Sequence, residues 1–328
     1  MSITQIIAFI QQTFCLSSTL LLGSTGEIIT EKSGNLNLGT PGIMATGAIS
    51  GIIGAYFYTK SGIAFNPIVS ILLTVLCGIV GSLIASLIYC FLTITLKTNQ
   101  NVTGLVLTTL GVGFSNFMGS LINSKMGGSG IAAFPEIGKA YKTALPFADK
   151  LGWFGEIFLS YGFMTYLAIV IAVISAVVIT KTRIGLNLRA VGENPATADA
   201  AGINVTRYKY VATCLGGVIS GLGGLYYVMD FASANWQNNI LGQFGWLAVA
   251  LVIFAVWRPN LAIIGSVIFA ALYVMGTYIP GLSPKDQKLF ELFPYLVTVI
   301  VLVIVSMRSK RETQPPESLG LSYFREER

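Results

Sequence analysis

The sequence lacks histidine altogether and carries little charge of either sign. Charged residues make up 10% of its 328 positions, against roughly 25% in soluble domains. The motifs H-E-x-x-H and G-x-S-x-G are absent, which argues against a zinc protease or a serine hydrolase. The P-loop motif G-x-x-x-x-G-K-[ST] is absent too, so the chain has no ATP site of that type. We therefore expect a protein that is not an enzyme and binds no cofactor of its own.

Cysteine chemistry is not indicated either. The four cysteines, Cys15, Cys77, Cys90 and Cys214, lie inside apolar stretches and show no C-x-x-C spacing. Such a pattern predicts neither a disulfide framework nor a metal site. The formal charge of +6 is explained by lysines and arginines gathered between apolar stretches. We therefore do not expect nucleic acid as a partner.

The sequence is rich in long uncharged stretches. A helix needs about 20 mainly apolar residues to cross the hydrocarbon, and each charge at mid-membrane costs about 2.5–3.5 kcal/mol. The uncharged tracts are 1–26, 33–59, 61–96, 98–124, 157–180, 210–229, 231–257, 259–284 and 292–307. We therefore predict an all-α polytopic membrane protein with about nine transmembrane helices, within a range of about eight to ten. The tract 61–96 fits either one tilted helix or a helix with a re-entrant piece.

The distribution of lysine and arginine predicts the orientation. Placing 182–208 in the cytoplasm puts thirteen basic residues on that side and seven on the other; the reverse violates the positive-inside bias. Residues 1–307 then form a transmembrane domain with its N-terminus outside. About 124–156 is an external segment, and 308–328 is a cytoplasmic tail. Because the N-terminus lacks a basic region and a small-residue cleavage site, 1–26 is expected to be a retained span.

The polar segment 182–208 has the features of a short capped helix. Asn194 suits an N-cap, Pro195 the first helical position, and Gly202 the position beyond the helix end. Helix–helix links usually run about 2–8 residues, so this length favours a surface for another protein, the alternative being a solvated connector. Small residues would let a partner approach closely, and charged residues would fix its register. The charged candidates are Arg189, Glu193, Asp199 and Arg207, and the amines of Lys181 and Lys209 are expected to reach the partner.

Two further expectations concern the membrane interior. Glu27 and Asp230 lie at tract ends, where we expect headgroup water to solvate them, so that no buried acid would serve an ion-driven carrier. Glycines recur four residues apart in two tracts, which favours close helix packing. These glycines are Gly47, Gly51, Gly217 and Gly221. We expect them to pack within the chain, the alternatives being a contact with a second subunit or a moving helix.

Two stretches carry a resemblance to a known family. Residues 26–48, GEIITEKSGNLNLGTPGIMATGA, look like the N-terminal signature of permease subunits in ABC importers for nucleosides and simple sugars. Residues 185–202, GLNLRAVGENPATADAAG, resemble the same family's cytoplasmic coupling loop. One departure lies at Thr40-Pro41-Gly42, where nucleoside-type relatives often have an acidic residue before the glycine.

The resemblance implies an ABC importer permease fold in a bacterial cytoplasmic membrane and a division of labour. A cytoplasmic ATPase, which holds ATP and Mg²⁺, would dock on the coupling loop. A second permease subunit, expected to be a longer paralogue in a heterodimer, would help to enclose the pathway. An extracytoplasmic substrate-binding lipoprotein would deliver the small solute. The residues that couple to the ATPase would be Arg189, Glu193, Asn194, Pro195, Asp199, Gly202 and Arg207.

Candidates for the substrate pathway are amides and aromatics within apolar tracts. Amides both donate and accept hydrogen bonds, and aromatic faces stack on bases or pack on sugars. The candidates are Asn37, Phe114, Asn116, Phe117 and Trp236. The alternatives are an interhelical hydrogen bond for Asn116, an outer loop in water for 235–239, and a turn or broken helix at Asn37.

The sequence therefore predicts a multi-pass permease that moves a nucleoside or related small solute and is energised by a separate ATPase. A simple sugar or riboflavin is the alternative solute. The alternative functions are an ion-gradient-driven secondary carrier and a non-transporting membrane scaffold. Uptake without an ATPase would indicate the carrier, and partner binding without saturable flux would indicate the scaffold.

Overall fold

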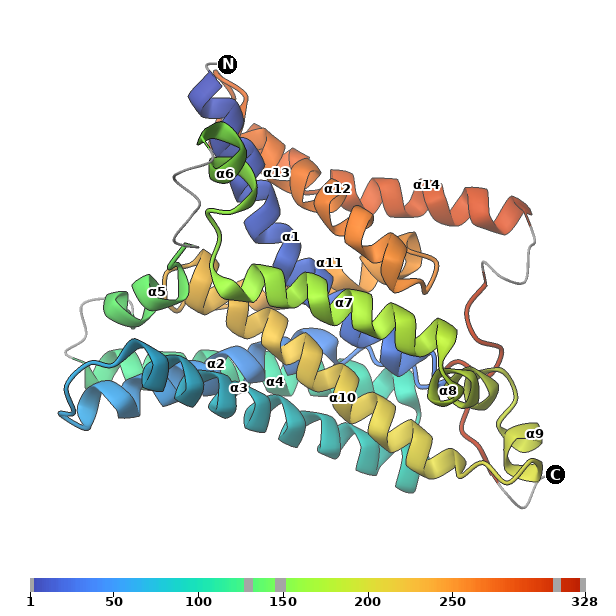
Figure 1. The fold of residues 1–328 in the computed structure, drawn as a ribbon. Coiled ribbons are helices and arrows are strands. Elements are labelled where there is room, and N and C mark those ends of the chain that lie inside the picture. The colour runs from blue at the N-terminus through green and yellow to red at the C-terminus, as the bar shows by residue number, and fades with distance from the viewer. Residues whose placement is uncertain (1–2, 127–131, 145–151, 309–313, 325–328) are drawn as a thin grey trace.

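The computed structural model describes residues 3–126, 132–144, 152–308 and 314–324. These residues form helices joined by mostly short links (Figure 1). The α-helices are α1 (Ile3–Glu31), α2 (Thr40–Lys60), α3 (Pro67–Cys90), α4 (Gln100–Lys125), α5 (Pro135–Tyr141), α6 (Gly152–Phe158), α7 (Phe163–Lys181), α8 (Arg183–Glu193), α9 (Pro195–Ala200), α10 (Val205–Tyr226), α11 (Ile240–Phe254), α12 (Pro259–Tyr278), α13 (Pro284–Phe290) and α14 (Phe293–Arg308). Two π-helical turns, η1 (Phe91–Thr95) and η3 (Tyr227–Phe231), continue α3 and α10.

In the described part of the chain, eight helical segments are long and apolar enough to cross a membrane. They are Thr4–Glu31, Thr40–Lys60, Pro67–Thr95, Gln100–Lys125, Phe163–Lys181, Val205–Phe231, Pro259–Tyr278 and Pro284–Ile304. The shorter apolar helix α11 occupies the tract 231–257, so each uncharged tract contains one main helix. The predicted all-α polytopic fold with about nine spans is therefore confirmed. Tract 61–96 contains one continuous helix, because η1 prolongs α3.

Asparagine and proline mark where several helices begin. The side chain of Asn66 accepts hydrogen bonds from the backbone N–H groups of Ile68 at 3.0 Å and Val69 at 3.3 Å, which caps α3. Asn99 caps α4 through the N–H of Val102 at 3.1 Å. Prolines occupy the first turns of α2, α3 and α12, where a missing N–H leaves no helical bond unmade.

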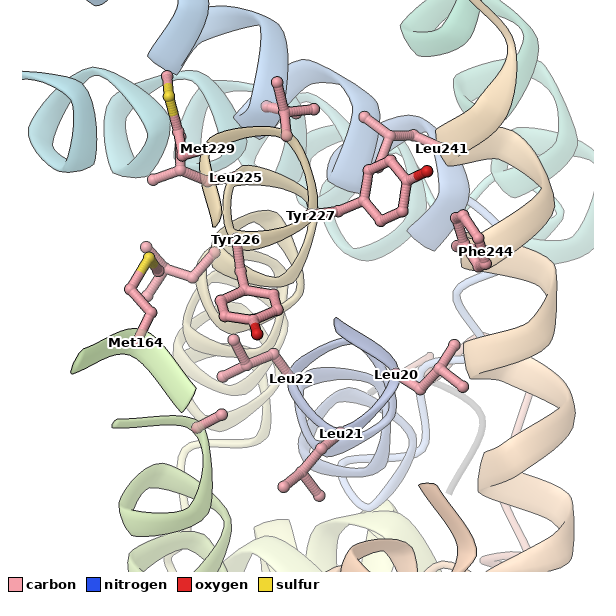
Figure 2. Packing of buried hydrophobic residues seen from close by; sticks show 14 of the residues in the cluster. Leu20, Leu21, Leu22, Met164, Leu225, Tyr226, Tyr227, Met229, Leu241 and Phe244 are labelled. Atoms are coloured by element: carbon pink, nitrogen blue, oxygen red, sulfur yellow. The ribbon is translucent and has the colours of Figure 1, made fainter. Parts of the chain in front are cut away.

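Helices α1, α2 and α10 form the centre of the bundle, with α3, α4, α7, α11 and α12 packed around them (Figure 1). In α2 and α10, 72% of the apolar stretch is buried, against 11% in the last span. Figure 2 shows Leu20, Leu21 and Leu22 of α1 in the same buried cluster as Tyr226 and Tyr227, where α10 passes into η3. In lipid such contacts stabilise by close packing rather than by removal from water.

Glycine allows the central helices to approach closely. A Cβ added to Gly47 of α2 would lie 2.8 Å from the Cα of Gly221 in α10, which is closer than such atoms can pack. The neighbours of Gly51 and Gly217 also belong to this chain; they include Leu225 and Ser86. The expectation that these glycines pack within the chain is therefore confirmed.

The outer faces of the peripheral helices are apolar. Along α3, exposed apolar side chains recur every four residues, at Ile68, Leu72, Leu76, Val80 and Ile84. A further exposed stripe on α14 comprises Leu296, Val299, Ile300, Val303 and Ile304. Continuous exposed apolar surface of this kind fits a lipid environment or a membrane-embedded partner.

The two ends of the bundle differ in character. We use "the α8–α9 end" for residues 32–39, 182–204 and 314–324, which meet on one side of the molecule (Figure 1). The first described residues lie at the opposite end (Figure 1), as an odd number of spans requires. Helices α5 and α6 belong to the predicted external segment 124–156, of which residues 127–131 and 145–151 lie outside the described residues.

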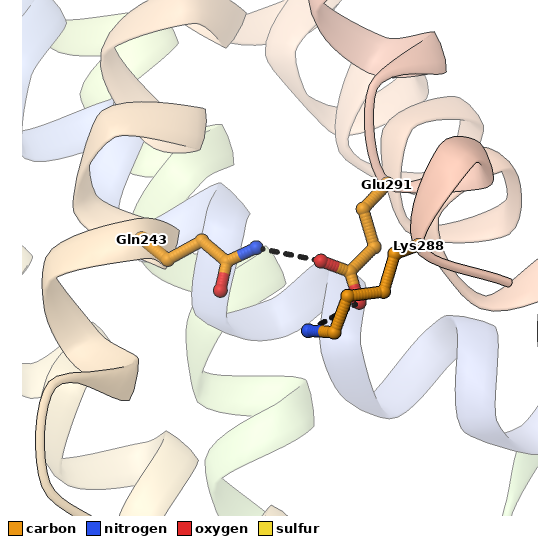
Figure 3. Close-up of polar contacts among 3 residues, drawn as sticks. All are labelled: Gln243, Lys288 and Glu291. Atoms are coloured by element: carbon orange, nitrogen blue, oxygen red, sulfur yellow. Dashed lines mark hydrogen bonds and ion pairs between the residues drawn. The ribbon is translucent and has the colours of Figure 1, made fainter. Parts of the chain in front are cut away.

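Polar contacts tie α11 to the start of the last span (Figure 3). Gln243 Nε2 of α11 donates a 3.0 Å hydrogen bond to Glu291 Oε2, between α13 and α14. Lys288 Nζ lies 3.9 Å from Glu291 Oε1. The lysine side chain is 77% exposed, so this ion pair contributes at most about 1 kcal/mol.

Candidate functional site

The segment 182–208 contains α8, α9 and the first turn of α10; of the two short helices, the sequence predicts only α9. Helix α8 begins after Thr182, whose hydroxyl oxygen accepts a 3.2 Å hydrogen bond from the N–H of Gly185. Leu188 and Val191 of α8 are buried, and their three-residue spacing fits one helical face. Thr182 as an N-cap, followed by this spacing, is the signal that would have identified α8.

The N-terminus of α9 has the predicted cap. Asn194 has an extended backbone conformation, and its Oδ1 accepts a 3.0 Å hydrogen bond from the N–H of Thr197. Pro195 is the first residue of the helix. Both expectations about local structure are confirmed, and the cap is worth about 1 kcal/mol.

The C-terminus of α9 is a Schellman motif. Gly202 has a φ of +82°, a conformation that glycine adopts without strain. Its N–H donates to the carbonyl of Asp199 at 3.0 Å, and the N–H of Ile203 donates to the carbonyl of Ala198 at 3.0 Å. These bonds satisfy carbonyls at the helix end. The helix stop predicted at Gly202 is therefore confirmed.

A groove of about 290 Å³ lies between α8 and α9. It is lined by Ala190, Glu193, Asn194, Thr197, Ala198, Ala201 and Ile203. Most of these side chains are small, so an incoming surface can approach the backbone closely. Of the predicted coupling residues, Glu193 and Asn194 line the groove, whereas Arg189 and Arg207 are exposed nearby. Asp199 is half-buried in the last turn of α9.

The C-terminal tail packs on this end of the molecule. The Oγ and the backbone N–H of Ser318 both donate to the carbonyl of Gly192 in α8, at 2.6 and 3.1 Å. The N–H of Gly320 donates to the carbonyl of Gly34 at 3.2 Å. The described part of the predicted polar tail therefore connects α8 to the α1–α2 link.

The link between α1 and α2 is non-helical and lies inside the bundle. Thr108 Oγ1 of α4 donates a 2.7 Å hydrogen bond to the carbonyl of Leu38. Thr108 lies eight residues into α4, or about 12 Å from its first residue. A Cβ on Gly104 would lie 2.9 Å from the backbone nitrogen of Leu38, so α4 and the link are in direct contact.

Side chains supply hydrogen-bond partners for backbone N–H and C=O groups of this non-helical link. The N–H of Leu36 donates to Gln100 Oε1 at 2.7 Å, and its carbonyl accepts from the hydroxyl of Tyr89 at 2.5 Å. The N–H of Gly39 donates to Asn37 Oδ1 at 3.0 Å. Non-helical backbone at membrane depth is stable only with such partners. Asn37 therefore closes a turn, which confirms the alternative stated for it.

Two glutamates of α1 are buried beside this link. The backbone N–H of Asn37 donates to Glu27 Oε1 at 3.2 Å, and the hydroxyl of Thr40 donates to Glu27 Oε2. Glu31 accepts a hydrogen bond from the indole N–H of Trp257. Glu27 is 1% exposed, so the expectation that headgroup water solvates it is wrong. Helix α1 continues past the apolar tract to Glu31, which places Glu27 among donors from the link.

Asp230 also differs from the sequence-based expectation. It lies in η3 and is 3% exposed, and its Oδ2 has no hydrogen-bond partner among the residues that the structure describes. A Cβ on Gly162, just before α7, would collide with this oxygen. The carboxylate is enclosed because the π-helical turn extends α10 to Phe231 and the start of α7 covers it. The expectation of solvation by headgroup water is wrong here too.

Charged residues of the α1–α2 link and α8 lie close together. Burial lowers the pKa of Lys32, and the nearby carboxylate of Glu193 opposes that shift. Glu193 therefore interacts with this chain as well as lining the groove. Lys209, expected to reach a partner, is only 4% exposed, so that expectation is wrong. Lys181 at the end of α7 is exposed.

The pathway candidates fall into separate places. Asn116 Nδ2 donates to Asn239 Oδ1 at 2.6 Å, and the N–H of Asn239 donates to Asn116 Oδ1 at 3.0 Å. The interhelical hydrogen bond stated as the alternative for Asn116 is therefore confirmed. Phe114 and Phe117 are 45% and 65% exposed on α4, so this chain does not enclose them.

Trp236 is buried against α4. Its Nε1–H donates to Asn238 Oδ1 at 2.9 Å, and its ring covers Gly119. A cavity of about 260 Å³ adjoins it, lined by Gly119, Ser120, Asn123, Ala132, Trp236, Gln237 and Asn238. Residues 237–239 are exposed, as the outer-loop alternative requires, but Trp236 is not. Asn116 and Trp236 thus lie in one region, and Asn37 lies in another.

Known proteins resemble this chain along nearly its whole length. Residues 9–302 match the family described as branched-chain amino acid transport system / permease component. The nucleoside ABC transporter permease protein NupC of Lactococcus lactis is 31% identical over 315 residues, which cover 94% of each chain. The guanosine ABC transporter permease protein NupQ of Bacillus subtilis is 30% identical over 333 residues, which cover 100% of each chain.

A third relative has a different named solute. The putative glucose ABC transporter permease protein TsgC13 of Haloferax volcanii is 30% identical over 331 residues, which cover 94% of this chain and 95% of that protein. The resemblance that residues 26–48 and 185–202 carry is confirmed by these matches. The chain therefore belongs to the branched-chain amino acid transport system / permease component family and is a multi-pass membrane protein.

Proposed function

We propose that this chain is the permease subunit of an ABC importer and moves a nucleoside across the cytoplasmic membrane, driven by a separate ATPase. The observation that carries the proposal is the capped helix α9 beside the α8–α9 groove. In an ATP-driven permease, this end is where a motor subunit would bind. ATP and Mg²⁺ would belong to that subunit.

The α8–α9 end is suited to a protein partner. Ile184 and Leu186 of α8 are 63% and 58% exposed, and Arg189 is exposed on the same helix. Apolar side chains next to an arginine are typical of protein interfaces. This end, including the C-terminal tail, would face the cytoplasm, as the positive-inside bias predicts.

The solute pathway would form between this chain and a second permease subunit. Phe114 and Phe117 are exposed on α4, where a partner could cover them. Asn116 and Trp236 would then lie near the outer opening, to which an extracytoplasmic lipoprotein would deliver solute. We expect the second subunit to be a longer paralogue, so that the pair is a heterodimer.

A nucleoside is the first choice of solute because NupC and NupQ are named for nucleoside and guanosine transport. A simple sugar is the second, because TsgC13 is named for glucose at similar identity. An ion-driven carrier would use membrane carboxylates that can gain and lose protons. Glu27 and Glu31 instead accept hydrogen bonds from donors within the chain. Asp230, with an oxygen that has no partner among the described residues, is the acid that such a carrier would use.

Uptake of labelled guanosine tests the proposal. Cells with the complete transporter are compared with cells that lack only this chain, and unlabelled glucose is added as a competitor. We expect saturable uptake that requires the chain, stops when ATP is depleted and resists excess glucose. Uptake that persists without ATP but stops when the ion gradient is collapsed would replace the ABC proposal with a secondary carrier. Competition by glucose would move the sugar to first place.

Amine cross-linking in native membranes tests the docking surface. Lys181 is exposed near α8 and should link to a protein with a P-loop. Lys209 is only 4% exposed and should form no link to another protein. If Lys181 reacts freely with a water-soluble label but forms no link to such a protein, α8 and α9 are not the ATPase-binding surface.

A further inference from the structure

A polar cavity of about 640 Å³ lies beside the α8–α9 groove. It opens between η1, the start of α4, the α9–α10 link and the C-terminal tail. Its polar and charged lining residues include Asn35, Lys97, Asp199, Arg207, Lys209 and Tyr323. Ligand pockets typically have volumes of about 300–1,000 Å³, so the cavity is large enough for a small ligand.

The charge of the cavity favours an anion. Among the described lining residues, Lys97, Arg207 and Lys209 bring three cations and Asp199 brings one carboxylate. That carboxylate already accepts a 2.9 Å hydrogen bond from the hydroxyl of Tyr323. Lys97 Nζ lies 4.1 Å from the ring centroid of Phe324, which holds this cation beside the tail.

Lys209 is the most unusual of these cations. It is 4% exposed, yet none of the described residues forms an ion pair or a hydrogen bond with its ammonium group. A largely buried cation without a counter-ion is costly unless water or an anion reaches it. Because Lys209 lines the cavity, a ligand in the cavity can supply the missing anion.

Asn35 provides a second, independent observation. It is 1% exposed and lines the same cavity. Its Nδ2 donates a 3.0 Å hydrogen bond to Thr213 Oγ1, whereas its Oδ1 has no partner in the described part of the chain. A buried carbonyl oxygen of this kind requires a donor. The cavity thus offers cations and one unused acceptor.

We propose that this cavity binds a phosphate group that also bears a hydroxyl donor. Lys209 and Arg207 would contact phosphate oxygens, and Asn35 Oδ1 would accept the hydroxyl hydrogen. Two sources share this chemistry: the headgroup of phosphatidylglycerol and soluble hydrogen phosphate. The cavity lies at the end of the span Pro67–Thr95 and at the beginnings of the spans Gln100–Lys125 and Val205–Phe231. In a membrane, the ends of spans lie at the depth of phospholipid headgroups.

Binding by the full-length protein in detergent tests this inference. Thermal unfolding is followed while phosphatidylglycerol, phosphatidylcholine, sodium phosphate or sodium sulfate is added at constant ionic strength. We expect stabilisation by phosphatidylglycerol, by phosphate, or by both, and little by phosphatidylcholine or by sulfate, which has no hydroxyl donor at neutral pH. Stabilisation by phosphatidylglycerol alone identifies a lipid site; an equal response to phosphate identifies a soluble ligand.

Variants of Lys209 decide whether this cavity is responsible. Lys209→Gln should weaken the apparent affinity by about tenfold or more, because a hydrogen bond to a charged group is lost, and Lys209→Arg should restore most of it. Lys181→Gln, at an exposed lysine outside the cavity, should bind like the unmodified protein. Since Lys209→Gln removes a buried charge, its unliganded form should be at least as stable. The inference is overturned if neither probe stabilises the protein, or if Lys209→Gln binds as well as Lys181→Gln.

Discussion

The hydroxyl of Tyr323 donates a 2.9 Å hydrogen bond to Oδ2 of Asp199, which joins the C-terminal tail to helix α9. The same tail bonds to α8 through Ser318 and to the α1–α2 link through Gly320. The non-helical C-terminal tail therefore connects both α8 and α9 to the α1–α2 link. A displacement of α9 by a partner would be transmitted through these contacts to the interior.

Removal of the Tyr323 hydroxyl should loosen α9. We expect Tyr323→Phe to lower the free energy of unfolding by about 1 kcal/mol, the usual net value of one hydrogen bond. It should also reduce ATPase stimulation by substrate in the assembled transporter. Both are measured on the purified complex, by thermal unfolding and phosphate release. Tyr56→Phe, at a residue whose ring packs near Lys60 and Phe57, is the control and should change neither.

Strain at Gly202 should disrupt coupling specifically. Gly202→Val forces a β-branched residue into a φ of +82°, which costs at least about 1–2 kcal/mol, and should unwind the end of α9. We expect substrate-stimulated ATPase activity to fall while solute binding is retained. Gly281→Val is a matched control, because Gly281 has a φ of +84° in open space away from the groove. Equal loss in both variants would show that general strain, not the shape of α9, is responsible.

Much of the fold could be predicted from local sequence. Uncharged tracts located the spans because the membrane excludes charge, and Asn194, Pro195 and Gly202 located α9 because capping is local chemistry. The sequence did not show how far α1 continues or that a π-helical turn extends α10. Because of these two features, Glu27 and Asp230 are buried, whereas the sequence predicted that headgroup water would solvate both. Their burial depends on donors and neighbours that are distant in the sequence.

The candidate site was predicted less completely than the fold. The role of Asn37 in the α1–α2 link depends on Gly39 and Glu27, and the link itself depends on Gln100 and Tyr89. The bond between Asn37 and Gly39 is local, and a turn at Asn37 was among the sequence-based alternatives. The contacts with Glu27, Gln100 and Tyr89 join the link to separate helices, and no single-sequence pattern indicates them. The tail was expected only as a polar terminus, since nothing in its composition identifies Gly192 and Gly34 as its partners.

Cys90 and Cys214 should be easily cross-linked. Their sulfur atoms lie 3.8 Å apart, between α3 and α10, although both thiols are free. A small side-chain movement would bring them to disulfide distance, about 2.05 Å. We expect mild oxidation of the full-length protein to link them, as read from non-reduced peptides by mass spectrometry. Cys15 and Cys77 should form no intramolecular link, and a link from either of them to Cys90 or Cys214 would contradict the described contact of α3 with α10.

The two kinds of buried acid should respond oppositely to amide substitution. Asp230 has an oxygen without a hydrogen-bond partner among the described residues, and a neutral amide is cheaper to bury than a carboxylate. Asp230→Asn should therefore raise the free energy of unfolding by about 1–2 kcal/mol. Glu27 accepts hydrogen bonds at both oxygens, from Asn37 and Thr40. Glu27→Gln puts an amide donor against one of those donors and should lower the free energy of unfolding by about 1–3 kcal/mol. Thermal unfolding of both variants at pH 7 checks the signs. If Asp230→Asn unfolds at a lower temperature than the unmodified protein, the carboxylate has a stabilising partner that lies outside the described hydrogen bonds, either elsewhere in this chain or in another molecule.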